Sequence, residues 1–177
     1  MDIFLIILCI LFWALSIWCL FGRQTIAPAL SFIALILLSF TSWFSPLVNN
    51  TMIIGWLAMT VVVMFAAYMQ PEPVRRQTKG MPFMIVGGVV GLALGLLGFT
   101  VSSVITLRYS LMIIAVAAGI FLGFLLYSQT PDGQPVRPGS GNFFKYLLAK
   151  GFPTAITLMQ LGVALVLLMV IKNVNGL

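Results

Sequence analysis

The chain has no histidine and only three acidic residues, Asp2, Glu72 and Asp132. Histidine and carboxylate side chains supply most general acids and bases, and histidine is a common ligand of catalytic zinc. The absence of histidine also excludes a Ser-His-Asp triad. We therefore expect no catalytic residue, no metal site and no cofactor, and we expect that the protein is not an enzyme.

Charged residues of both signs are scarce as well, at 7% of the 177 residues against 62% apolar residues. A soluble domain carries about 25% charged residues, because its surface must face water. With a mean hydropathy of +1.17, this chain lacks the polar residues needed to cover a water-soluble globule. The composition predicts a protein embedded in a lipid bilayer.

Long apolar segments fill most of the sequence. A helix needs about 20 apolar residues to cross roughly 30 Å of hydrocarbon, and within lipid it satisfies its own backbone hydrogen bonds. Cutting the sequence at charged residues, prolines and polar clusters leaves segments at 3–21, 27–45, 52–69, 83–101, 110–127 and 154–171. We predict an all-α, polytopic membrane helix bundle with six transmembrane helices, in which residues 1–177 form a single domain without a soluble part.

The basic residues are distributed unevenly between alternate loops, and Lys and Arg in short loops stay on the cytoplasmic side. One set of loops contains Arg23, Arg75, Arg76, Lys79, Arg137, Lys145 and Lys150, and the other contains Arg108 and Lys172. This bias predicts that both termini face outward, and it suits a bacterial inner membrane. Because the basic residues are scattered along the membrane edges, the net charge of +6 does not indicate nucleic-acid binding.

Small residues recur four apart in the fourth and fifth predicted spans. They are Gly87, Gly91 and Gly95, extended by Gly98, and then Ala115, Gly119 and Gly123. Helix association in lipid depends on close backbone approach, which small residues permit. The two stripes match in depth, so we predict that these helices form the tightest contact in the bundle. The stripes also suit a groove for a partner helix, or a hinge.

The last predicted span carries a polar edge, formed by Thr154, Thr157 and Gln160 on one helix face. We expect this edge to point into the bundle or toward a partner, because an amide facing lipid would stay unpaired. It serves either as an interhelical hydrogen bond or as the lining of a path for water or a solute.

Basic residues on the predicted inner surface form a cluster of Arg75, Arg76, Lys79, Lys145 and Lys150. Such a cluster meets anionic lipid headgroups or an acidic partner. In residues 142–150, apolar side chains share one face, which predicts a short helix lying in the inner interface. Asn142 would cap its start, and Gly151 and Pro153 would end it.

Two classes of function fit these features. In the first, the chain is a non-catalytic subunit or accessory component of a larger membrane complex, such as a transport, secretion or energy-converting machine. Its partners are then the lipid bilayer and other membrane subunits or further copies of itself. In the second, it is a small oligomeric permease, channel or solute-binding protein whose path is lined by Thr154, Thr157 and Gln160.

Overall fold

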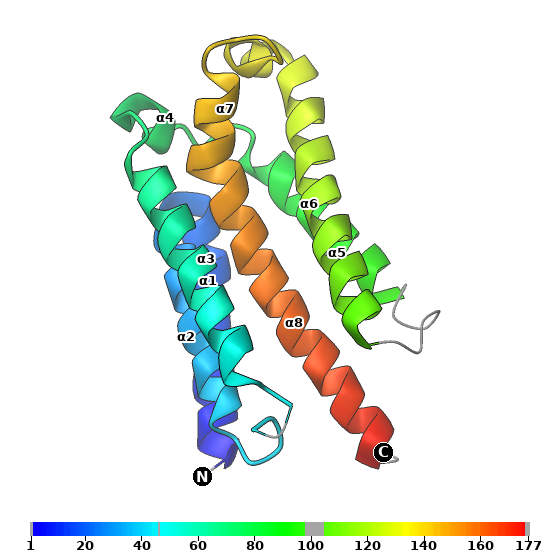
Figure 1. Cartoon of the computed structure of the whole chain (residues 1–177). Helices are drawn as coiled ribbons and strands as arrows, with labels where there is room; N and C mark the ends of the chain where they lie inside the picture. The colour runs from blue at the N-terminus through cyan, green and yellow to red at the C-terminus, as the bar shows by residue number, and fades with distance from the viewer. Residues whose placement is uncertain (1, 46, 98–104, 176–177) are drawn as a thin grey trace.

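The structure is a computed structural model that describes residues 2–45, 47–97 and 105–175, all of whose regular elements are helical. The elements are α1 (Asp2–Gly22), α2 (Ala27–Ser39), α3 (Asn50–Tyr68), α4 (Glu72–Arg76), α5 (Met81–Leu97), α6 (Ile105–Gln129), the 3-10 helix η2 (Pro131–Val136), α7 (Phe143–Tyr146), the π-helix η3 (Leu147–Gly151) and α8 (Phe152–Asn175). The long helices run alternately up and down, and the two ends of the chain lie at the same end of the bundle (Figure 1).

Four helical segments are long and apolar enough to cross a membrane: Asp2–Gly22, Asn50–Tyr68, Tyr109–Gln129 and Phe143–Val170. The predicted count of six spans is not confirmed, because α2 has 13 residues and α5 has 17 within the described chain. At 1.5 Å per residue, these helices are about 20 and 26 Å long, less than the roughly 30 Å of hydrocarbon. Residues 98–101 of the fourth predicted span lie outside the described residues.

Helix α2 ends at Ser39, six residues before the predicted boundary at residue 45. Hydroxyl side chains at this end of the helix bond to the backbone of its last turn. Ser39 donates to the carbonyl of Ile36 at 2.7 Å, and Thr41 donates to the carbonyl of Leu38 at 2.7 Å. Such local bonds compete with helix propagation, so the apolar run alone overestimated the length of this helix.

The predicted interfacial helix at 142–150 is corrected by the structure. Residues 143–175 form one continuous helical run, in which α7 passes through η3 into α8 without a break. Proline inside an α-helix lacks a donor and clashes with the carbonyl four residues earlier. Here the wider π-turn precedes Pro153, and the N–H of Phe152 bonds to the carbonyl of Leu147. The π-turn accommodates the proline, so Gly151 and Pro153 do not end the helix.

The α7–α8 run is the central element of the bundle. Of the residues in an apolar stretch of 18 residues of this run, 67% are buried, against 17% in the corresponding stretches of α1 and of α3. Helices α2, α3, α5 and α6 all pack against α8. Ser31 of α2 donates to the carbonyl of Thr157 at 3.3 Å, and Ser16 of α1 donates to the carbonyl of Ala27 at 2.8 Å. Helix α1 is therefore peripheral and joins the core mainly through α2.

Candidate functional site

Helices α5 and α6 are the most extensively packed pair in the structure, and their glycines face one another. A Cβ atom added to Gly87 would lie 2.2 Å from the carbonyl oxygen of Gly119. A Cβ atom on Gly91 would lie 2.2 Å from the carbonyl oxygen of Ala115. These distances are far below van der Waals contact, so the two backbones touch where only glycine fits.

The remaining small residues continue this contact toward both ends of the pair. A Cβ atom on Gly123 would lie 2.2 Å from the carbonyl oxygen of Phe83, and one on Gly95 would lie 2.7 Å from Cα of Met112. Gly119 lies between Gly87 and Gly91, because its added Cβ would meet atoms of both residues. Gly98, at the end of the predicted stripe, lies outside the described residues.

The outward side of the α5/α6 pair forms a groove of about 630 Å³. Its floor consists of the small residues, and its walls are apolar side chains that stand out from the bundle. The wall of α5 contains Val86, Val90 and Leu94, and the wall of α6 contains Ala118, Leu122 and Leu126. Val90 is 52% exposed and Leu122 is 58% exposed, so no other part of the described chain covers the groove.

The polar edge of α8 points into the bundle, and all three of its side chains are buried. Gln160 donates through Nε2 to the hydroxyl of Thr60 in α3 at 2.9 Å. Thr154 and Thr157 donate to the carbonyls of Lys150 and Pro153 in their own helix, each at 2.8 Å. One acceptor, Oε1 of Gln160, has no hydrogen-bond partner among the described residues. The polar edge therefore links α8 to α3 through one hydrogen bond, and Oε1 of Gln160 stays unpaired among the described residues.

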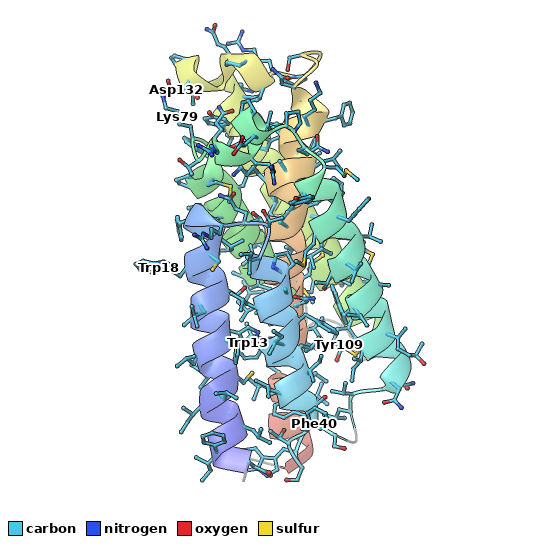
Figure 2. All side chains as sticks on the ribbon, turned by 90° about the vertical axis from the view of Figure 1, so that its left-hand side faces the viewer. Trp13, Trp18, Phe40, Lys79, Tyr109 and Asp132 are labelled. Atoms are coloured by element: carbon cyan, nitrogen blue, oxygen red, sulfur yellow. The ribbon has the colours of Figure 1, made fainter. Side chains whose placement is uncertain are left out.

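The residues of the predicted basic cluster differ in their partners and exposure. Arg76 pairs with Glu72 at 2.6 Å, and Lys79 pairs with Asp132 at 3.3 Å. Figure 2 shows the second pair at the end of the bundle. Lys145 is exposed. Arg75 and Arg76 line one pocket, and the carbonyl of Arg75 accepts from Lys150, so the five residues differ in their surroundings.

Lys150 differs most from the sequence-based expectation, because it is only 1% exposed. Its ammonium donates to Oε1 of Gln24, in the turn between α1 and α2, and to the backbone carbonyl of Arg75. The continuous α7–η3–α8 run turns this side chain into the bundle. The sequence analysis did not identify Gln24, since one glutamine in a short connection gives no signal of a contact 126 residues away.

Comparisons with known proteins found no match: no family model, no curated protein and no solved structure matches the chain. Within the described ranges, no group of three or more His, Cys, Asp or Glu side chains is placed to hold a metal ion. Three features of the bundle remain as candidates for function: the α5/α6 groove, the polar contact at Gln160, and the basic end around Lys150.

Proposed function

We propose that this chain is a non-catalytic subunit of a larger complex in a bacterial inner membrane. In this proposal, the α5/α6 groove receives a transmembrane helix of a partner subunit. The observation that carries it is the groove itself, a long apolar depression on the outer side of the bundle. The predominance of helix over loop in the described chain leaves little mass outside the bundle for other chemistry.

The spacing of the groove walls favours a helix as the occupant. Val86, Val90 and Leu94 are four residues apart on α5, and Ala118, Leu122 and Leu126 are four apart on α6. The side-chain ridges of an α-helix repeat with the same spacing, so that a ridge of one helix fits between ridges of another. The glycine floor lets a partner backbone approach closely, which is the main source of helix association in lipid.

The test is purification of the intact chain from its native membrane in mild detergent, followed by mass determination of the complex. We expect stoichiometric foreign subunits to purify with the chain. Val90→Trp fills the groove and should remove them. Val62→Trp is the matched control, because Val62 is 63% exposed on α3, away from the groove.

Three outcomes would contradict the proposal. The chain purifies alone, or the partner is lost equally in both variants, or Val90→Trp breaks up a homo-oligomer without any foreign subunit. The last result would place a second copy of the chain in the groove.

A second candidate is a small permease or channel, and the unpartnered Oε1 of Gln160 favours it. A buried carbonyl oxygen without a protein partner suits a bound water or a passing polar solute. Purified protein in liposomes would then cause a solute leak that Gln160→Leu abolishes. Liposomes that stay tight with the unaltered protein would reject this function.

A further inference from the structure

A second pocket, of about 530 Å³, is lined in part by α4, which lies at the end of the bundle opposite the chain termini in Figure 1. Its walls come from the turn between α1 and α2, the last turns of α3, and α4. Three arginines and one glutamate line it: Arg23, Arg75, Arg76 and Glu72. Three positive charges and one negative charge leave a formal balance of +2 in a chain whose described surface is otherwise mostly apolar.

The charges in this pocket are only partly compensated within the protein. Glu72 is committed to Arg76, with which it forms a pair at 2.6 Å. The guanidinium of Arg75 lies over the ring of Tyr68, 5.0 Å from its centroid, which fixes its position without neutralising its charge. Arg23 is exposed and forms no ion pair with any residue that the structure describes.

Two buried hydrogen-bond donors on this pocket lack an acceptor. Gln24 lines the pocket and is only 3% exposed. Its Oε1 accepts from Lys150, which directs the amide nitrogen away from the lysine. Neither Nε2 of Gln24 nor Nε of Arg75 has a hydrogen-bond partner among the described residues. Buried donors are almost always paired, so two unpaired donors on one pocket indicate a missing acceptor.

The buried charge of Lys150, which contacts Gln24, also favours an anion in the pocket. The buried ammonium of Lys150 contacts two neutral oxygens, Oε1 of Gln24 and the carbonyl of Arg75, and no carboxylate pairs with it among the residues described. An anion in the pocket would face this ammonium across the amide of Gln24. Guanidinium groups suit phosphate in particular, because their planar N–H groups match its oxygens in bidentate geometry.

We propose that this pocket, which we name the arginine pocket, binds a phosphate-bearing anion between Arg23, Gln24 and Arg75. The position of the pocket at one end of the bundle makes a lipid headgroup the expected source of the phosphate. Tyr68, which lines the pocket, is 66% exposed, and Trp18, four residues before Gly22 of the pocket, is 79% exposed and projects from α1 in Figure 2. Exposed Trp and Tyr mark the headgroup layer, and basic pockets between helices bind anionic lipid headgroups there.

The binding test uses the full chain, delipidated in neutral detergent and titrated with phosphatidylglycerol, with bound lipid counted by native mass spectrometry. Arg23→Gln and Arg75→Gln should each weaken binding about fivefold, the factor expected when one basic residue near the surface is removed. Lys145→Gln removes the same charge from an exposed site outside the pocket, and it should leave binding within about twofold of the unaltered protein.

Inorganic phosphate and phosphatidylcholine distinguish the sources of the anion. A headgroup site binds phosphatidylglycerol more tightly than phosphatidylcholine and resists competition by millimolar inorganic phosphate. If inorganic phosphate alone binds and Arg75→Gln weakens it, the arginine pocket stands as an anion site for soluble phosphate.

Two results would overturn the proposal: no loss of binding in Arg23→Gln and Arg75→Gln, or an equal loss in Lys145→Gln. The side chain of Arg23 forms no hydrogen bond or ion pair with the part of the chain that the structure describes, so its variant stays informative even if Arg75→Gln folds poorly. The result is independent of the partner groove, because Val90→Trp leaves the arginine pocket intact.

Discussion

A buried lysine without a carboxylate partner depends on its neutral acceptors. The ammonium of Lys150 is held by the side chain of Gln24 and the backbone of Arg75, which links α7–α8 to the α1–α2 turn and to α4. Removing one acceptor leaves the buried ammonium short of a hydrogen-bond partner, which costs stability. Removing donor and acceptor together leaves neither of these two groups unpaired, so the cost is smaller. This asymmetry makes the contact testable by paired substitutions.

We predict that Gln24→Leu lowers the free energy of unfolding by about 2 kcal/mol, because it removes a hydrogen bond to a charged group. Adding Lys150→Met to this variant should recover part of the loss, since both polar partners are then apolar. Unfolding in mixed micelles with increasing dodecyl sulfate measures both values. A double variant less stable than Gln24→Leu alone would show that Lys150 does not depend on Gln24.

The hydrogen bond between Gln160 and Thr60 is the second polar contact between distant helices that we expect to matter. Thr60→Val should lower the free energy of unfolding by about 1 kcal/mol, because it removes the acceptor of the buried amide. In a Gln160→Leu background, Thr60→Val should lower the free energy of unfolding much less. Thr157→Val is the control, since that hydroxyl bonds within its own helix. Additive effects of the two substitutions in the same unfolding measurement would argue against the contact.

At the scale of the elements, the α5/α6 pair depends on the absence of side chains at its interface. We predict that Gly91→Leu destabilises the bundle by about 3 kcal/mol, because overpacking forces the two backbones apart. Gly55→Leu provides the control, since nothing lies within 4 Å of an added Cβ there. Thermal unfolding in detergent and the monodisperse fraction in size-exclusion chromatography measure the difference. Equal stability of the two variants would mean that α5 and α6 do not pack through Gly91.

Where a helix ends depends on local hydrogen bonds and backbone geometry, which a hydropathy profile does not show. The apolar run of α2 extends past Ser39, yet the helix ends there, where the hydroxyls of Ser39 and Thr41 bond to carbonyls of the last turn. In the opposite sense, Gly151 and Pro153 predict a helix end, and the π-turn carries the helix through both. The burial of the α7–η3 face explains the second case, because the continuous helix places Phe143 and Tyr146 against Phe124.

At the scale of the whole molecule, the basic residues predict the orientation. Both described chain ends lie at one end of the bundle, opposite α4 and η2 (Figure 1). We predict that green fluorescent protein fused to either terminus is exported and stays dark. Inserted after Gly139, it should stay in the cytoplasm and fluoresce. Alkaline phosphatase fusions should give the reverse pattern. A bright terminal fusion would reverse the orientation and place the arginine pocket on the outer face.

The sequence by itself determined that the chain is helical and that several of its helices are long and apolar enough to cross a membrane. These properties depend on composition and on runs of about 20 apolar residues, which are local quantities. It also indicated the small residues of α5 and α6, because their spacing along a helix is visible in one dimension.

Only the tertiary structure decided which polar groups meet. Lys150 appears in the sequence as one more surface charge, and Gln24 as part of a turn. Their contact depends on the continuous α7–α8 helix and on the position of the α1–α2 turn, which no local pattern encodes. A buried polar group takes its role from its partners, and those partners come from distant parts of the chain.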